Sequence, residues 1–145
     1  MHEILFRGKR IANGKWASGY YVIRKRPYFK DKGVNFEHII CDNLVIDDFN
    51  DKQFVDTIPI TYSVDPETVG QYTGLTDTNG NKIFEGDIVW DNCEEERGVV
   101  QWYNDMAKFI ITYSTFTVDF DNVYGEELQI VGNVYDNAEL IKEKQ

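Results

Sequence analysis

Two Asn-Gly dipeptides constrain the fold of this chain more than any other feature of its sequence. Asn13-Gly14 and Asn79-Gly80 each stand between runs of aromatic and β-branched residues. Asn-Gly supplies the two positive φ angles of a type I′ turn, which joins antiparallel strands through two residues. Each dipeptide therefore predicts a β-hairpin, one near the start of the chain and one early in its second half.

Strand-like patterning extends along most of the chain, and no early segment sustains the i, i+3, i+4, i+7 spacing of an amphipathic helix. Residues 36–46 fit either a buried strand or a short helix. Pro66 can begin one helical turn, and Asn137 can cap a closing helix. The expected strands lie around residues 4–6 and over 16–23, 54–62, 83–90, 98–102, 108–113 and 128–134, and the closing helix covers 138–144.

The sequence therefore predicts an all-β, mostly antiparallel fold. Gly86-Asp87-Ile88-Val89, an acidic loop and Gly98-Val99-Val100 follow one another in the order typical of a small SH3-like barrel. Closing such a barrel removes exposed strand edges, and its glycines allow the strands to bend sharply. We expect this barrel in the C-terminal half, packed on an N-terminal β-hairpin region, with a short C-terminal helix.

Residues 1–145 are expected to form a single compact unit, because no segment has the composition of a long flexible linker. The dipeptide Asp65-Pro66 breaks the pattern, since the residue before a proline avoids the helical region. A subdivision into an N-terminal β region, 1–62, and a C-terminal barrel, 63–145, is therefore the alternative.

The two cysteines, Cys41 and Cys93, show no local pairing pattern, so we expect two free thiols. The first residues lack the charged start and apolar core of a signal peptide. No apolar run approaches the roughly 20 residues of a membrane-spanning helix. The sequence thus predicts a cytoplasmic protein without a membrane segment.

Charge is distributed unevenly along the chain, whose formal net charge is −10. Residues 1–30 contain eight Lys or Arg and one Glu, a balance of +7, so the remainder carries −17. A basic start of this kind can bind nucleic acid, or it can lie against acidic protein of the same or another chain. We favour the second interpretation, because a net-acidic surface repels phosphate backbones.

The basic start also provides the candidate interaction surface. If the first hairpin forms, Arg7 and Lys9 share one face of its first strand. Aromatic residues interleaved with the cations could stack on bases while the cations follow phosphates. The alternative is a charged strand edge whose aromatic residues belong to the core. The candidate surface consists of Arg7, Lys9, Arg10, Arg24, Lys25, Arg26 and Tyr28.

Metal-binding patterns are incomplete. Asp77-x-Asn79-x-Asn81 imitates the opening of a calcium loop, but the sixth position of the pattern is Lys82 instead of Gly and the twelfth is Ile88 instead of Glu. His38 and Cys41 have the spacing of half a zinc site, and no second spaced pair accompanies them. We expect neither a metal nor a cofactor.

Catalytic patterns are also weak. Paired carboxylates at Glu85 and Asp87, and the run from Glu94 to Glu96, could in principle perform acid-base chemistry. Both stretches fit turn and solvated-loop chemistry better. Scaffolds for nucleophilic hydrolysis and for nucleotide binding are missing from the sequence. We therefore predict a non-enzymatic protein without catalytic residues.

Three stretches resemble the YopX family, which is encoded largely by bacterial phages and prophages. Residues 65–77 read DPETVGQYTGLTD and residues 80–89 read GNKIFEGDIV, like the signature segment of that family. The end, IVGNVYDNAEL at 130–140, and the start, ILFRGKR at 4–10, resemble its closing and opening segments. Residues 25–60 carry no match, and Ala138 stands where the family has a proline. The resemblance implies an all-β protein and carries over no catalytic residue.

These observations together favour a phage or prophage accessory protein that binds another protein, or a second copy of itself, in the bacterial cytoplasm. The alternative is a nucleic-acid-binding module that uses the basic first 30 residues. A third hypothesis, an acidic mimic of nucleic acid, depends on the −17 balance alone.

Overall fold

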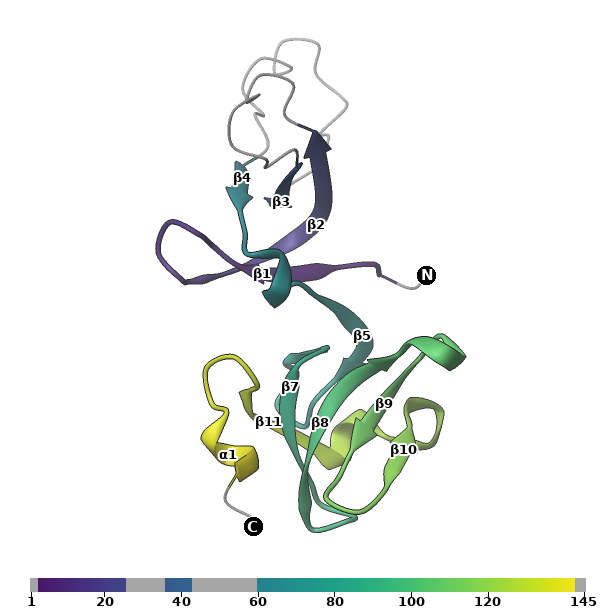
Figure 1. Cartoon of the computed structure of the whole chain (residues 1–145). Helices are drawn as coiled ribbons and strands as arrows, with labels where there is room; N and C mark the ends of the chain where they lie inside the picture. The colour runs from purple at the N-terminus through teal and green to yellow at the C-terminus, as the bar shows by residue number, and fades with distance from the viewer. Residues whose placement is uncertain (1–2, 26–35, 43–59, 143–145) are drawn as a thin grey trace. The chain divides into compact units, whose positions relative to one another are not determined.

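The computed structural model describes residues 3–25, 36–42 and 60–142 of the chain. Its chain divides into two units, and each is described by itself. The first unit comprises residues 4–69, and the second comprises residues 70–145 together with residues 1–3. Both are built from antiparallel strands, so the predicted all-β fold is confirmed (Figure 1).

The first unit contains an antiparallel sheet in the order β4-β3-β2-β1. The predicted first hairpin is present: Phe6 lies opposite Gly19 and Lys9 lies opposite Trp16. Residues 36–42, which the sequence left open between strand and helix, form the third strand. The strands are β1 (Phe6–Lys9), β2 (Trp16–Lys25), β3 (Phe36–Asp42) and β4 (Ile60–Ser63), followed by the single 3-10 turn η1 (Pro66–Thr68).

One face of this sheet forms the core of the first unit. Ala17, Ile40 and Val64 are buried there, and Tyr21 and Tyr62 pack against them. Gly8 belongs to the same face, because a side chain added there would meet Val64 and Val69 at about 3 Å. Ala17 and Tyr21 of β2 therefore point into this core, and the even-numbered residues of β2 point to the other face.

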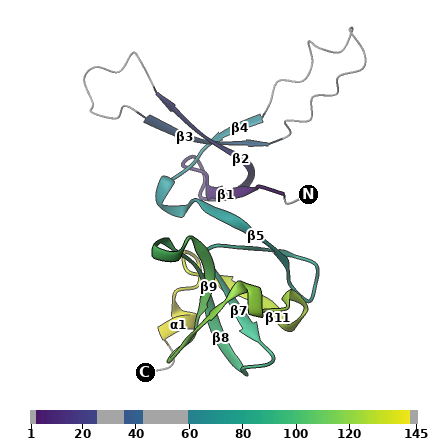
Figure 2. The same cartoon turned by 90° about the vertical axis from the view of Figure 1, so that its right-hand side faces the viewer.

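The second unit contains a five-stranded antiparallel sheet in the order β10-β9-β8-β7-β11, and β5 pairs with β6 beside the predicted Asn79-Gly80 turn. Figures 1 and 2 show the short helix α1 alongside the sheet. The elements are β5 (Gly70–Thr76), β6 (Lys82–Phe84), β7 (Asp87–Asp91), β8 (Glu96–Tyr103), β9 (Lys108–Thr112), β10 (Thr117–Asp119), β11 (Leu128–Asn133) and α1 (Glu139–Lys142), with 3-10 turns η2 (Asn104–Met106), η3 (Phe120–Asn122) and η4 (Gly125–Glu127).

The core of the second unit lies on one face of the five-stranded sheet. Its fully buried members come from β6, β7, β8, β9 and β11. At about 25 cal/mol for each Å² of apolar surface removed from water, this cluster is the main source of the unit's stability. The buried members are Ile83, Val89, Val100, Ile111, Tyr113 and Leu128.

Three predictions for the second unit need correction or remain unconfirmed. The strand predicted over 83–90 is two strands, because Gly86 has a φ of 91° and interrupts it between β6 and β7. The five-stranded sheet is open: within the described ranges, no pairing joins β10 to β11, so the SH3-like barrel is not confirmed. The closing helix begins at Glu139, and residues 143–144 of the predicted helix lie outside the described part.

Candidate functional site

The first hairpin brings two cations onto one aromatic ring. Arg7 and Lys9 share a face of β1, as predicted, and Trp16 lies opposite Lys9 on β2. The guanidinium carbon of Arg7 lies 4.6 Å from the centre of the Trp16 ring, and Nζ of Lys9 lies 5.6 Å from it. Cation–π attraction contributes about 0.5–1 kcal/mol at exposed sites, so the ring positions both side chains.

Arg10 is held in the same way by a different strand. Its guanidinium carbon lies 3.8 Å from the centre of the Tyr62 ring of β4. Nε of Arg10 is buried, and no hydrogen-bond acceptor contacts it in the described part of the chain. The Tyr62 ring therefore provides the main positioning contact for this cation.

Arg24 is neutralised locally, near the far end of β2. Its Nη2 donates to the carboxylate of Glu37 on β3 at 2.6 Å. Ser63 on β4 donates its hydroxyl to the other oxygen of the same carboxylate at 2.7 Å. Lys25, the next residue, is exposed at the end of β2. Arg26 and Tyr28, the last two members of the predicted surface, lie outside the described residues.

Exposed apolar side chains continue the same face of β2. Tyr20 is 50% exposed and Val22 is 43% exposed. Strand alternation places both on the side of Trp16 and Arg24, away from the core. Tyr20 is one of the aromatic residues interleaved with the cations in the sequence, but Val22 was not named among the predicted residues, although the i, i+2 spacing from Trp16 to Arg24 was visible. We name this the β2 face, and it consists of Arg7, Lys9, Trp16, Tyr20, Val22 and Arg24.

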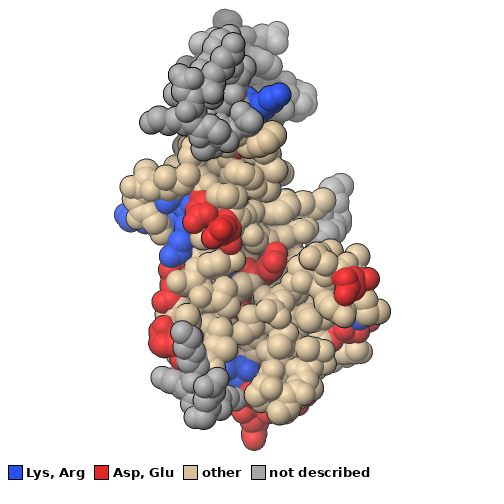
Figure 3. All heavy atoms as spheres, viewed as in Figure 1, with Lys and Arg blue, Asp and Glu red and all other residues tan. Residues whose placement is uncertain are grey.

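The β2 face lies in a strongly basic segment. Residues 4–25 contain six Lys or Arg and no Asp or Glu. Figure 3 shows Lys and Arg atoms gathered around the turn between β1 and β2. Asp and Glu atoms lie directly beside them in that view. The first hairpin is thus a local cationic surface in a chain whose net charge is negative.

Comparison with known protein families confirms the resemblance seen in the sequence. The family model described as YopX protein matches residues 21–142, which is most of the chain. The chain belongs to the YopX family. Among curated proteins, none matches it. The YopX match contains the two longer stretches that carried the resemblance, 65–89 and 130–140, and it begins within β2, after the first hairpin turn.

The buried carboxylates of this YopX protein stabilise turns. Asp77 accepts hydrogen bonds from the backbone N–H groups of Asn79 and Asn81 at 2.9 Å and of Ile130 at 3.0 Å. Burial acts to raise the pKa of Asp77, but these donors outweigh it and hold that pKa below its usual value. The calcium-like pattern is therefore a hairpin turn whose first carboxylate is saturated by backbone donors.

Other carboxylates near β6 and β7, among them the pair Glu85 and Asp87 considered for acid-base chemistry, have structural surroundings of the same kind. Asp87 is 1% exposed and accepts a hydrogen bond from the backbone N–H of Phe84 at 2.8 Å. Burial raises the pKa of its neighbour Glu85. Asp91 accepts a hydrogen bond from the hydroxyl of Tyr113. It also accepts hydrogen bonds from the backbone N–H groups of Cys93 and Glu94 at the start of the β7–β8 turn.

The zinc-like pair of His38 and Cys41 is separated by the geometry of β3. A spacing of three places two strand residues on opposite faces. Nδ1 of His38 is hydrogen-bonded to the hydroxyl of Tyr21, whereas Cys41 lies opposite Tyr20 on the other face. Within the described ranges, no group of three or more His, Cys, Asp or Glu is arranged to hold a metal ion.

The β7–β8 turn is acidic, whereas the first hairpin is basic. Cys93 is exposed. A hydrogen bond from its thiol to Glu127, together with the nearby charges of Glu127, Asp91 and Glu94, raises the pKa of Cys93 to about 11.

Among the described helices, none is long and apolar enough to cross a membrane.

Proposed function

We propose that this YopX-family chain is a non-enzymatic phage or prophage accessory protein that binds an acidic, partly apolar protein segment through the β2 face. The observation that carries the proposal is the continuity of Arg7, Lys9 and Trp16 with exposed Tyr20 and Val22 on one side of the first sheet. Aromatic residues and arginine are enriched in protein interfaces and dominate their binding energy.

The arrangement around Trp16 favours a protein over a nucleic acid. Bases stack on open aromatic faces. The Trp16 ring already has Arg7 and Lys9 over it. Val22 provides an aliphatic contact that suits a protein side chain better than a base, and Arg24 is paired with Glu37, whose carboxylate repels phosphate.

The charge of the segment supports an acidic partner. Residues 4–25 contain six Lys or Arg and no Asp or Glu, and Arg7 and Lys9 of this segment lie on the β2 face, where they attract negative charge and accelerate the encounter with it. The exposed Tyr20 and Val22 then supply apolar area that becomes buried on binding. A second copy of this chain is one source of such a partner, because residues 70–145 contain fifteen Asp or Glu and five Lys or Arg.

A nucleic-acid-binding module is the second candidate function. The same six cations without a carboxylate favour it, because cations that contact phosphates release counterions on binding. Binding of that kind weakens steeply with salt and depends little on Tyr20 and Val22. Both candidates act in the bacterial cytoplasm under this proposal.

The two candidates are separated by fluorescence anisotropy with two probes on the full chain. One probe is a labelled peptide of alternating Glu and Val residues, and the other is a labelled mixed-sequence single-stranded DNA. We expect the peptide to bind at low salt. The double variant Tyr20→Thr/Val22→Thr should weaken this binding by about tenfold or more, because the apolar part of the surface is lost.

Ile23→Thr is the matched control for this experiment. Ile23 is adjacent to Val22, is also β-branched and is 55% exposed, but it points to the opposite face of β2. The peptide affinity of Ile23→Thr should equal that of the unmodified protein. Salt-sensitive binding of the DNA without binding of the peptide would overturn the proposal in favour of the second candidate. Loss of peptide affinity in Ile23→Thr equal to that in the double variant would also contradict the β2 face.

A further inference from the structure

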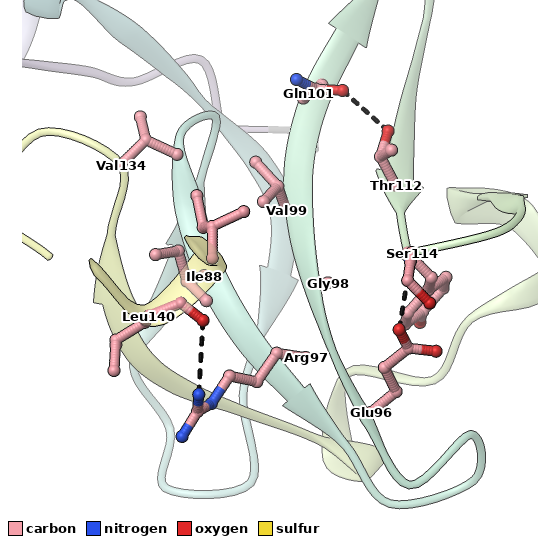
Figure 4. A pocket seen from close by; sticks show the side chains of 12 residues that line it. Ile88, Glu96, Arg97, Gly98, Val99, Gln101, Thr112, Ser114, Val134 and Leu140 are labelled. Atoms are coloured by element: carbon pink, nitrogen blue, oxygen red, sulfur yellow. Dashed lines mark hydrogen bonds between the residues drawn. The ribbon is translucent and has the colours of Figure 1, made fainter. Parts of the chain in front are cut away.

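The second unit contains a cavity of about 300 Å³ on the face of its sheet opposite the core. The cavity lies between the middle strands β7, β8 and β9 and the segment that leads into α1 (Figure 4). Small-molecule sites are concave, mostly apolar and about 300–1,000 Å³ in volume, so this cavity has the size of a small one.

Apolar side chains make up the centre of the cavity. Ile88 of β7 is fully buried at its floor, and Val99 of β8 lies beside Ile88 in the register of the two strands. Val134, Leu140 and Ile141 form the wall on the α1 side. Figure 4 shows Val99, Ile88 and Val134 grouped together, with Leu140 next to Ile88.

The α1 wall is fixed to the sheet by hydrogen bonds at two points. Nη1 of Arg97 donates to the carbonyl of Leu140 at 3.3 Å. The backbone N–H of Val134 donates to the carbonyl of Gly86 at 2.9 Å. The cavity is therefore formed before any ligand arrives, which lowers the entropic cost of binding.

Polar groups lie at the edges of the cavity. Thr112 of β9 donates its hydroxyl to Oε1 of Gln101 at 2.7 Å, and the backbone N–H of Ser114 donates to the Glu96 carboxylate at 3.1 Å. Both bonds lie on the β9 side, opposite the α1 wall (Figure 4). The Gln101 side chain accepts from Thr112 through its oxygen, so its amide N–H groups can donate to a carbonyl or hydroxyl oxygen of a ligand.

The charges of the second unit and of the cavity lining determine whether a charged or an uncharged ligand is favoured. Residues 70–145 contain fifteen Asp or Glu against five Lys or Arg, so the field of the second unit opposes an entering anion. The cavity lining itself contains one cation, Arg97, and one carboxylate, Glu96, so a charged ligand of either sign meets a like charge there. An uncharged ligand encounters neither barrier.

We infer that this cavity binds a small, uncharged, mainly apolar molecule that carries one carbonyl or hydroxyl group. Its apolar part lies over Ile88 and Val99 against Leu140, and its polar group points toward Gln101 and Thr112. The cavity shares no residue with the β2 face, so the inference does not depend on the proposed function.

Three six-carbon probes test the inference by their charge. Hexanamide, hexanoate and hexylammonium are titrated into isotopically labelled full-length protein, and amide chemical shifts are followed by NMR. We expect hexanamide to shift the signals of Val99, Thr112 and Leu140 at concentrations where the two charged probes do not. Stronger binding of hexanoate, or the absence of any shift at these residues, would overturn the inference.

Val99→Phe and Val131→Phe provide the matched pair of variants. Val99→Phe places a larger side chain in the cavity and should weaken hexanamide binding by about tenfold. Val131 on β11 is 38% exposed and does not line the cavity, so Val131→Phe should bind like the unmodified protein. Leu140→Ala removes one of the three apolar side chains of the α1 wall and should weaken binding as well. Unchanged affinity in both Val99→Phe and Leu140→Ala would place the probe elsewhere and contradict the site.

Discussion

The carboxylate of Asp77 joins the β5–β6 turn to the backbone of Ile130, 53 residues further along the chain, through a hydrogen bond of 3.0 Å. Its other oxygen accepts the N–H groups of Asn79 and Asn81 within the turn. One buried side chain thus fixes a local hairpin and attaches it to β11. The second Asn-Gly hairpin is consequently held by tertiary contacts as well as by its own turn.

Replacing Asp77 by Asn should lower the free energy of unfolding at pH 7 by about 2 kcal/mol. Hydrogen bonds to a charged acceptor each contribute about 1.5–3 kcal/mol, and the Asn amide would turn a donor toward one of the three N–H groups. Urea unfolding followed by circular dichroism measures the loss. Asp121→Asn, at an exposed position in η3, is the control and should change stability little.

The same residue should give a defined dependence of stability on pH. The pKa of Asp77 is lowered in the folded protein, so its stabilisation is fully present above the unfolded pKa of about 4 and is lost as the pH falls through the folded value. The difference in unfolding free energy between the unmodified protein and Asp77→Asn should therefore shrink below pH 4. A difference that stays constant from pH 7 to pH 3 would contradict this assignment.

Cys93 should react slowly with alkylating reagents despite its exposure. The thiolate is the nucleophile, and the hydrogen bond to Glu127 and the adjacent carboxylates raise the pKa of Cys93 to about 11. In a Cys41→Ala background, the rate of alkylation by iodoacetamide should still be rising at pH 10. Glu127→Gln removes the charged acceptor and should increase the rate at pH 8 by about tenfold, which corresponds to one pKa unit. Glu126→Gln, at the neighbouring position, is the control, and an equal increase there would assign the effect to general charge.

Gly19 should tolerate no side chain. A Cβ atom at this position would lie 2.1 Å from the carbonyl oxygen of Cys41 on β3. Overpacking of this kind costs about 1–3 kcal/mol or more, because backbone has to move. Gly19→Ala should lower the midpoint of urea unfolding, whereas Ser18→Ala, on the exposed face next to it, should leave the midpoint nearly unchanged.

The sequence predicts those parts of the fold that depend on local chemistry. Both Asn-Gly hairpins are present, and Gly14 and Gly80 have φ values of 69° and 80°, but Asn13 and Asn79 do not have the positive φ that a type I′ turn requires, so the predicted turn type is wrong. Gly86 looks like a strand residue in the sequence, but its N–H donates to the carbonyl of Val100 and its φ is 91°. That break depends on a partner strand which the local pattern does not contain.

In the candidate surface, too, local sequence predicted some features, whereas others depend on neighbouring strands. Alternation along a strand was enough to place Arg7 and Lys9 on one face. The contact of both cations with Trp16 depends on the register between β1 and β2, and the pairing of Arg24 with Glu37 depends on β3. Local sequence is weaker evidence for the SH3-like barrel than for a turn or a strand. Closure of a barrel requires pairing between strands at opposite ends of the sheet, which local sequence does not encode.

The contact between Arg7 and Trp16 should be measurable as a coupling energy. A double-mutant cycle with Arg7→Gln and Trp16→Leu isolates the interaction of the two side chains from their other contacts. With the guanidinium carbon 4.6 Å from the ring centre at the surface of the sheet, the coupling should be about 0.5–1 kcal/mol.

Lys15→Gln, in the exposed turn of the same hairpin, replaces Arg7→Gln in the control cycle and should give no coupling with Trp16→Leu. Urea unfolding at low and high salt provides the free energies, and a coupling that falls as salt rises distinguishes a cation–π contact from apolar packing. Coupling of the same size in both cycles would mean that Trp16 stabilises the hairpin by burial alone, and the cations of the β2 face would then be positioned by something other than its ring.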